Sequence, residues 1–341
     1  MRRAARMTAT HSHLPAAILG NEALAALYPD WTAEKILRKT GVRERRIAAP
    51  GETAADLAEA AASKLFAAHH IDPQSIDFLL LCTQTPDHLL PTTACILQAR
   101  LGLRTDCGAL DFNLGCSGFV YGLALAKGLI DSGAASRVLL LTADTYSKLI
   151  HPMDKSVRTL FGDGAAATLV EAVEVDDADE EPIGPFVFGT DGRGAANLAV
   201  PAGGMRLPRS AETGVEHTDG SGNVRSDDHL RMDGAEIMAF TLKAVPQAVA
   251  QLLAKARLAL EDFDLFVFHQ ANAFMLERLR HKLAIPADRF VVSLQMSGNT
   301  VSSSIPIALE PYIDAAQAGR RRAMLVGFGV GYSWAATSLA Y

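Results

Sequence analysis

Cysteine is scarce in this sequence, and long apolar runs are missing. Four cysteines in 341 residues, none of them in a Cys-x-x-Cys pair, indicate neither a disulfide scaffold nor a structural zinc site. A formal net charge of −6 disfavours nucleic-acid binding, because nucleic-acid-binding proteins carry a basic face or stripe. The longest apolar runs, residues 79–82 and 138–142, are far shorter than the roughly 18 residues that span a bilayer, so we expect no membrane segment.

Two further absences narrow the possible functions. The first seven residues are basic but lead into no apolar stretch, so we expect no secretory signal and a cytoplasmic protein with reduced thiols. The sequence has no Walker, His-Glu-x-x-His or Gly-x-Ser-x-Gly motif, which excludes P-loop nucleotidases, zincins and the usual serine α/β-hydrolases. The turn at 327–332 lacks the spacing of a dinucleotide-binding loop, but its backbone N–H groups would suit an oxyanion.

The chain contains an internal repeat. Residues 60–83 and 247–270 both read as a helix, a short turn and an apolar strand, which is opened by Asp77 in the first copy and by Asp264 in the second, 187 positions later. Residues 133–141 match 319–326, and 162–170 match 329–339, at nearly the same separation. The strands are apolar on both faces and therefore need helices on both sides. We predict a duplicated α/β fold with stacked layers.

The repeat divides the chain into three parts. Residues 1–175 form the first half, and residues 231–341 form the second. Residues 176–230 differ from both, because they follow an acidic run at 171–181 and contain Gly-rich, polar stretches. We expect this segment to be an irregular cap or connector on the surface.

Cys116 is the candidate nucleophile. It lies in the sequence Gly-Cys-Ser-Gly, directly before a predicted helix at 119–131. A cysteine at a helix N-terminus feels the positive end of the helix dipole, which lowers the pKa of its thiol and favours the reactive thiolate. The other three cysteines have no such position, and we expect them to be structural.

Two further polar residues are candidate site residues because of their places at the end of a strand and before a helix. His269 ends the apolar strand at 265–268, where α/β sheets present groups to ligands, and Asn272 three residues later suits either that site or a helix cap. Asn299 precedes a predicted apolar helix at 305–316. Because the repeat pairs Cys116 with Ser302, the duplication should bring the two helix N-termini together around a pseudo-two-fold axis.

The sequence resembles the thiolase superfamily and, within it, the β-ketoacyl-acyl carrier protein synthase III family. The matching motifs are GCSGF at 115–119, FGDGAAATLV at 161–170, HQAN at 269–272 and GNT at 298–300. The resemblance implies a five-layered α-β-α-β-α fold, a homodimer and a Cys116, His269, Asn299 triad. It also implies an oxyanion site made by the backbone N–H groups of Cys116 and Val330.

The resemblance also implies a set of substrate-binding positions. They are Lys35, Lys39, Lys155, Met232, Gly234, Asn272, Phe274 and, from the loop of a partner subunit that closes the acyl pocket, Leu90. Lys35 and Lys39 stand where the family commonly has a tryptophan and an arginine that stack on the adenine of coenzyme A. Lys155 and Phe274 also replace basic residues of the family. Lysine binds phosphate as a point charge but cannot stack or form a bidentate fork, so the donor carrier stays open.

The implied reaction is a decarboxylative Claisen condensation. An acyl group held on Cys116 would react with a malonyl thioester to give a β-ketoacyl thioester, with acyl-coenzyme A or an acyl carrier protein as partner and without cofactor or metal. The alternative is an acyltransferase that moves the acyl group from Cys116 to an oxygen or nitrogen acceptor. A non-catalytic partner subunit is disfavoured because Cys116 is retained. The acyl chain length and the pathway stay open.

Overall fold

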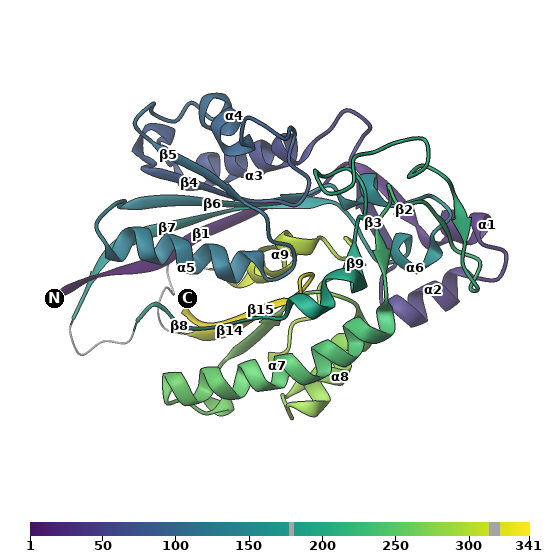
Figure 1. Ribbon diagram of the computed structural model, residues 1–341. Helices are drawn as coiled ribbons and strands as arrows, with labels where there is room; N and C mark the ends of the chain where they lie inside the picture. The colour runs from purple at the N-terminus through teal and green to yellow at the C-terminus, as the bar shows by residue number, and fades with distance from the viewer. Residues whose placement is uncertain (177–180, 314–320) are drawn as a thin grey trace.

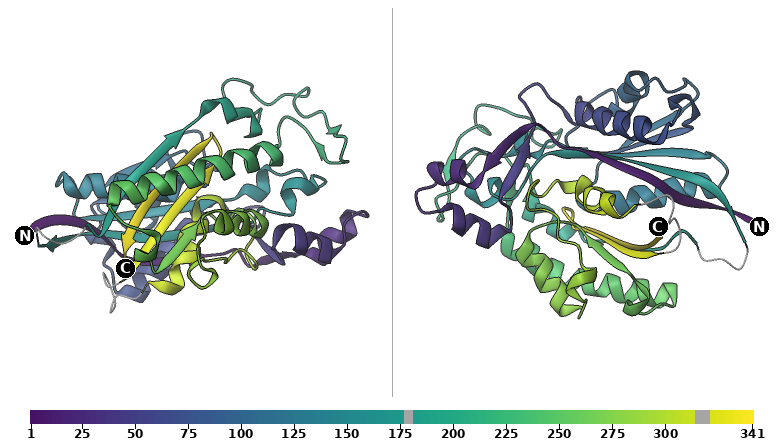
Figure 2. Two further views of the ribbon diagram at one scale, coloured as in Figure 1. Left: turned by 90° about the horizontal axis from the view of Figure 1, so that it is seen from below. Right: turned by 180° about the vertical axis from the view of Figure 1, so that it is seen from behind.

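The computed structural model describes residues 1–176, 181–313 and 321–341, and it has five layers. Figure 1 shows two stacked β-sheets with helices above, between and below them, and the view from behind in Figure 2 has the same order. The predicted five-layered α-β-α-β-α fold is therefore confirmed.

The first sheet has the strand order β1-β7-β6-β4-β5 and the second has the order β13-β14-β15-β8. The strands of the first sheet are β1 (Arg2–His13), β4 (Phe78–Cys82), β5 (Gly108–Phe112), β6 (Arg137–Asp144) and β7 (Gly164–Val175). Those of the second are β8 (Ile183–Thr190), β13 (Leu265–Phe268), β14 (Arg322–Gly329) and β15 (Ser333–Ala340).

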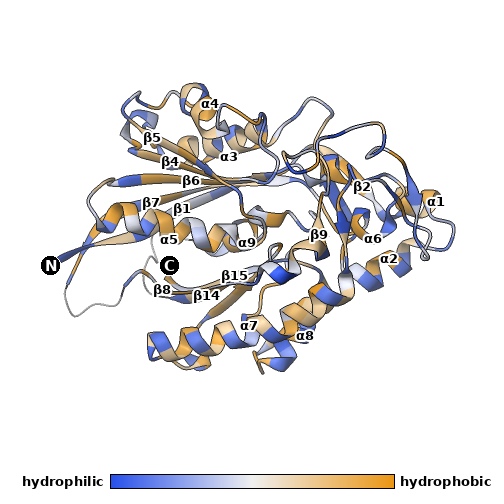
Figure 3. Ribbon diagram, viewed as in Figure 1, coloured by the Kyte–Doolittle hydropathy of each residue, from blue (hydrophilic) through white to orange (hydrophobic). Residues whose placement is uncertain are grey.

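The helices cover both sheets on both faces. The outer helices on the first sheet are α3 (Ala54–His69) and α4 (Thr93–Arg100), and those on the second are α7 (Gly234–Ala256) and α8 (Ala273–Lys282). Between the sheets lie α5 (Gly118–Asp131) and α9 (Ser304–Leu309). This central layer is apolar (Figure 3) because it faces a sheet on either side, and Phe119, Leu123 and Ile305 are fully buried there.

The duplication predicted from the sequence is confirmed by strand order and direction. In the first sheet β1 pairs antiparallel with β7, β7 antiparallel with β6, and β6 parallel with β4. In the second sheet β8, β15, β14 and β13 follow the same pattern. The central helices α5 and α9 are thus counterparts, one from each half.

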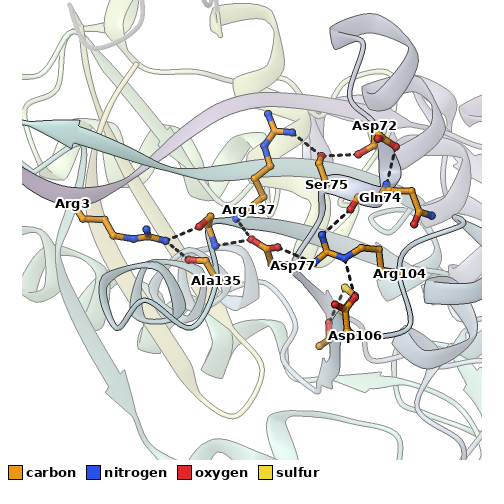
Figure 4. A network of polar contacts seen from close by, with 12 residues as sticks. Arg3, Asp72, Gln74, Ser75, Asp77, Arg104, Asp106, Ala135 and Arg137 are labelled. Carbon is orange, nitrogen blue, oxygen red and sulfur yellow. Dashed lines mark hydrogen bonds and ion pairs between the residues drawn. The ribbon is translucent and has the colours of Figure 1, made fainter.

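The two aspartates of the repeat, Asp77 and Asp264, accept equivalent hydrogen bonds in the two halves. Asp77 accepts hydrogen bonds from the backbone N–H groups of Ser136 and Arg137 at 2.8 and 3.0 Å, where β6 begins, and it also pairs with Arg104 (Figure 4). Asp264 accepts one from the N–H of Arg322, where β14 begins, at 2.8 Å. Each carboxylate therefore ties the start of one strand to the start of its parallel neighbour.

Two boundaries differ from the prediction. The segment 176–230 is not irregular throughout, because it contains β8, which pairs with β15 and is the counterpart of β1. Gly184 and Pro185 interrupt the strand pattern of β8 in the sequence and concealed it. The helix predicted at 305–316 is also shorter: α9 ends at Leu309 and a 3₁₀ turn, η7 (Glu310–Tyr312), follows. The end of the predicted helix lies outside the described residues.

The rest of the segment forms a cap beside the helix N-termini. It contains η3 (Gly192–Asn197) and a small sheet of β10 (His217–Thr218) and β11 (Val224–Arg225), and its β9 (Leu198–Ala199) pairs with β12 (Arg231–Met232), which follows the segment. It packs on η2 (Tyr146–Leu149) and α6 (Lys155–Arg158), and the N–H of Leu230 donates to the carbonyl of Leu149 at 2.7 Å.

The remaining elements are short. A small sheet of β2 (Ala17–Gly20) and β3 (Glu44–Ile47) lies beside α1 (Asn21–Leu27) and α2 (Ala33–Thr40) at one end of the molecule (Figure 1). Short 3₁₀ turns are η1 (Pro73–Ser75), η4 (Leu260–Asp262), η5 (Ala287–Arg289) and η6 (Val301–Ser303).

Helix α7 is long and apolar enough to cross a membrane, which the sequence analysis did not anticipate. It is instead an outer helix of the fold. Val245, Val249 and Leu252 are buried against the second sheet, whereas Lys243 on another face is exposed. An apolar face packed on a sheet accounts for the composition of this helix.

Candidate active site

Cys116 lies in the loop between β5 and α5, two residues before the helix begins, and it is only 4% exposed. The second sheet comes very close to it. A Cβ atom added to Gly329, at the end of β14, would stand 2.9 Å from the Cβ of Cys116 and 3.0 Å from its Sγ. Glycine at 329 is therefore what keeps the thiol accessible to a second group.

The electrostatics of Cys116 differ from the prediction. Burial raises the pKa of the Cys116 thiol, and the nearby Asp144 carboxylate raises it further, while the N–H of Cys116 itself lowers it. Loss of hydration outweighs the helix terminus here, so the thiol of the unliganded protein is protonated at neutral pH. The thiolate must form as the substrate binds or reacts.

His269 follows β13 directly and is 2% exposed. Its Nδ1 lies 2.7 Å from the Ser304 hydroxyl, and that oxygen also accepts the N–H of Gln270 at 3.4 Å. We assign the hydroxyl proton of Ser304 to Nδ1, which leaves the imidazole N–H on Nε2. Burial lowers the pKa of His269 to about 3, so the ring is neutral at physiological pH.

Asn299 places a second donor beside that nitrogen. Its Oδ1 accepts a hydrogen bond from the N–H of Val301 at 2.9 Å, which turns Nδ2 towards His269. Nδ2 lies 3.5 Å from His269 Nε2. The backbone N–H of Asn299 is bound to the carbonyl of Leu160, so the loop before α9 is anchored to the first half. The result is two N–H groups that face the same space.

The three residues line one cavity. Its other lining residues are mostly apolar: Leu160, Phe161, Leu198, Met232, Gly234, Ile237, Met238, Ala271, Asn272, Met275, Phe328 and Gly329. The ring of Phe328 meets His269 edge-on at 5.4 Å between centroids and holds the imidazole from the side. Three predicted binding residues, Met232, Gly234 and Asn272, thus lie with the triad. Asn272 also caps α8, because its side chain accepts the N–H of Met275.

Val330, Leu90 and Phe274 lie outside the group that lines this cavity. Val330 follows β14, and its side chain packs against the same apolar cluster as Cys116. Leu90 is 83% exposed, in the loop between β4 and α4. Phe274 is 51% exposed on α8, with the Arg278 guanidinium 4.8 Å from its ring centroid.

The three predicted lysines do not line the cavity and lie on α2 and α6. The ammonium groups of Lys35 and Lys39 lie 5.5 and 5.4 Å from the ring centroid of Trp31, which sequence reasoning missed. Both lysines are on α2, which packs on α8, the helix that Asn272 caps. Lys155 begins α6 under the cap, where a Cβ on Gly222 would lie 3.4 Å from its ammonium nitrogen.

Ser304 and the side chain of Phe328 were also missed, since the turn at 327–332 was considered only for its backbone N–H groups and Ser304 was given no role. A signal for Ser304 did exist: it follows Ser302, the repeat counterpart of Cys116, by two residues. Serine at that helix start contacts His269 of the same half.

The comparisons with known proteins agree with this geometry. The family models for 3-oxoacyl-[acyl-carrier-protein (ACP)] synthase III match residues 110–192, and those for its C-terminal part match 253–341. The β-ketoacyl-[acyl-carrier-protein] synthase III of Caldanaerobacter subterraneus subsp. tengcongensis is 36% identical over 340 residues, which is 99% of this chain and 98% of the relative. The chain belongs to the β-ketoacyl-[acyl carrier protein] synthase III family.

Solved structures of synthase III proteins also match nearly the whole chain. A crystal structure of a 3-oxoacyl-(acyl-carrier-protein) synthase III superposes with a TM-score of 0.95 at 59% identity, covering 99% of this chain and all of that one. The priming β-ketosynthase of the R1128 polyketide pathway superposes with a TM-score of 0.85 at 30% identity, covering 99% and 96%. The chain is accordingly an acyl-transferring enzyme.

Proposed function

We propose that the protein catalyses the decarboxylative condensation of an acyl thioester with a malonyl thioester through an acyl-Cys116 intermediate. The observation that carries this is the convergence of His269 Nε2 and Asn299 Nδ2 beside Cys116 in one cavity. A pair of neutral N–H donors suits the enolate oxygen that forms when a malonyl thioester loses carbon dioxide. Simple acyl transfer has no need of that pair.

The steps follow from the residues. Cys116 Sγ attacks the thioester carbonyl, the carrier thiol leaves with the cysteine proton, and the backbone N–H groups of Cys116 and Val330 receive the oxyanion. The malonyl thioester then loses carbon dioxide, and His269 with Asn299 stabilises the enolate. Its carbon attacks the acyl-Cys116 carbonyl, the C–S bond breaks, and the thiolate takes a proton from solvent. The product is a β-ketoacyl thioester.

The approach to the site supports a phosphorylated carrier arm as the donor. Lys35, Lys39 and Lys155 are cations at the entrance, and Trp31 between the first two offers an aromatic face. Coenzyme A and the phosphopantetheine of an acyl carrier protein both carry such phosphates. The exposed Phe274–Arg278 pair on α8 would contact the carrier protein.

A homodimer in the cytoplasm is part of the proposal. Strand β5 is an edge of the first sheet, and its Leu110 is 46% exposed. Leu89 and Leu90 are exposed on the neighbouring loop, at 77% and 83%. A second copy that paired along this edge would cover these side chains, and Leu90 of the partner subunit would then close the acyl pocket.

Intact-protein mass spectrometry tests the proposal. The protein is incubated with acetyl to octanoyl thioesters, with and without malonyl thioester, and Cys116→Ala serves as the control. We expect an adduct that is absent in the control and disappears when malonyl thioester is added, with release of a β-ketoacyl product. An adduct that persists with malonyl thioester present would overturn condensation and support transfer to an oxygen or nitrogen acceptor.

The similarity to synthase III proteins supports fatty-acid initiation as the pathway. The residues at Lys35, Lys39 and Phe274 bear on the donor carrier instead. Comparing acyl-coenzyme A with acyl carrier protein donors of the same chain in the mass assay distinguishes the two carriers.

A further inference from the structure

Three polar side chains form a hydrogen-bonded chain close to Cys116. The Tyr146 hydroxyl donates to Gln84 Oε1, and Gln84 Nε2 donates to Asn113 Oδ1 at 3.0 Å. Gln84 and Asn113 follow neighbouring parallel strands, β4 and β5, and Tyr146 begins η2 after β6. The carboxyl ends of three adjacent strands thus place an amide, a phenol and a second amide together.

This chain lies against the nucleophile. A Cβ atom on Gly115, the residue before Cys116, would stand 2.6 Å from Gln84 Oε1. Tyr146 belongs to the same packed cluster as Cys116 and is 3% exposed. Burial raises the pKa of Tyr146, and the nearby Asp144 carboxyl raises it further, so the phenol stays neutral.

The cavity that Cys116 shares with His269 and Asn299 already has a proposed role. The cavity shared with His269 and Asn299 is lined by α7 and α8 and would admit the carrier arm and the malonyl unit. Gln84, Asn113 and Tyr146 come from the first sheet and are not among the residues that line it. They are left to contact the acyl group on Cys116, a conclusion that rests on the proposed function.

The chemistry of the chain indicates what that acyl group carries. Among the described residues Gln84 Nε2 has one acceptor, so its second N–H is available, and the Tyr146 oxygen can still accept. An alkyl chain would bury these groups without partners, whereas an oxygen substituent would pair with them. Asp144 lies directly behind, accepting the Gln84 backbone N–H at 2.8 Å, which disfavours a carboxylate on the acyl group.

We propose that Gln84 and Tyr146 select acyl groups with a neutral oxygen substituent, hydroxyl or ketone, close to the thioester. In acylation the Cys116–S–acyl bond forms, the bond to the carrier sulfur breaks, and the carrier thiol leaves with the cysteine proton. The substituent takes no part in this exchange and affects only binding in the acyl pocket. Gln84 and Tyr146 are therefore specificity residues rather than catalytic ones.

Acylation rates of Cys116 with donors of equal length test the proposal. We would measure them by intact mass with N-acetylcysteamine thioesters of butyrate, 3-hydroxybutyrate and acetoacetate, and use acetyl as the reference. We expect at least one oxygen-bearing donor to react about tenfold faster than butyryl. Gln84→Leu and Tyr146→Phe should bring that ratio close to one by raising the butyryl rate.

The matched controls are Gln247→Leu on the exposed face of α7 and Tyr312→Phe on η7, and both should keep the wild-type ratio. Equal rates for butyryl and all oxygen-bearing donors would overturn the inference, as would a ratio that survives both Gln84→Leu and Tyr146→Phe. The acetyl adduct separates this from the proposed function. If it forms while the preference is absent, only the inference fails, and if no donor gives an adduct, the proposed function fails as well.

Discussion

The two halves of the molecule bring the N-terminus of a central helix to the same place but use it differently. In the first half the start of α5 carries the nucleophile Cys116, whereas in the second half the start of α9 carries Asn299 and Ser304. Neither terminus holds a complete site, because the enolate that His269 and Asn299 would stabilise has to react with the acyl group on Cys116. In the proposed mechanism, the two equivalent helix termini therefore contribute different side chains to one reaction.

The close contact between Gly329 of the second half and Cys116 of the first is the point where a small change should have the largest effect. We expect Gly329→Ala to reduce acylation of Cys116 at least about a hundredfold, because the added methyl group would stand 3.0 Å from Sγ. The rate of adduct formation measures it, with far-UV circular dichroism to confirm folding. Gly192→Ala, where an added Cβ meets nothing within 4 Å, should acylate normally. Normal acylation of Gly329→Ala would show that the halves are less closely fitted.

The halves also respond to pH in opposite directions. Burial lowers the pKa of His269 to about 3 from 6.5, so the unfolded chain takes up a proton first and acidification below 6.5 destabilises the protein. Burial raises the pKa of Asp144 to about 7 from 3.8, so its contribution is full below 3.8 and is lost as the pH rises through 7. Between about pH 4 and 6.5 the two effects oppose each other.

Removing either ionisable group should reveal the pH dependence of stability that the other contributes. Urea unfolding of Asp144→Asn between pH 6.5 and 4 should show stability falling by up to about 1.4 kcal/mol more per pH unit than in the wild type. His269→Gln should instead gain stability relative to the wild type on acidification. Parallel pH profiles for the wild type and both variants would contradict the opposed pKa shifts.

Ser304 would determine which ring nitrogen of His269 carries the proton. Ser304→Ala removes the donor to Nδ1 and with it the preference for an N–H on Nε2. Decarboxylation of malonyl thioester should fall about five- to tenfold, while acylation of Cys116 stays unchanged. Ser132→Ala, an exposed serine after α5, is the matched control. An equal fall in both steps would mean that Ser304 supports the fold rather than the tautomer.

The smallest expected effect lies within α5 itself. Gly128 lies in the last turn of the helix, and an added Cβ would meet no atom within 4 Å. Gly128→Ala should stabilise the protein by about 0.5–1 kcal/mol, because alanine has the better helix propensity, and leave acylation unchanged. Denaturant unfolding measures the gain. A loss of stability would mean that the space around Gly128 cannot accommodate a methyl group.

The sequence predicted the layers because the repeat is carried by local patterns, such as the aspartates at 77 and 264 that open matching strands. It missed β8, where Gly184 and Pro185 break the alternation. It also predicted a lowered pKa for Cys116 from the helix terminus alone, since burial and Asp144 come from other segments. The Tyr146–Gln84 contact joins residues 62 positions apart, and no local pattern reveals it.

The division of labour between the halves is tested most directly by Asn299→Ala. Two measurements are made on one preparation: formation of the Cys116 adduct by intact mass, and release of carbon dioxide from malonyl thioester. Loss of one of the two donors to the enolate oxygen should reduce carbon dioxide release by about 10²–10³ and leave adduct formation close to wild type. If both fall together, or if carbon dioxide release is unchanged, the assignment of one step to each half is wrong.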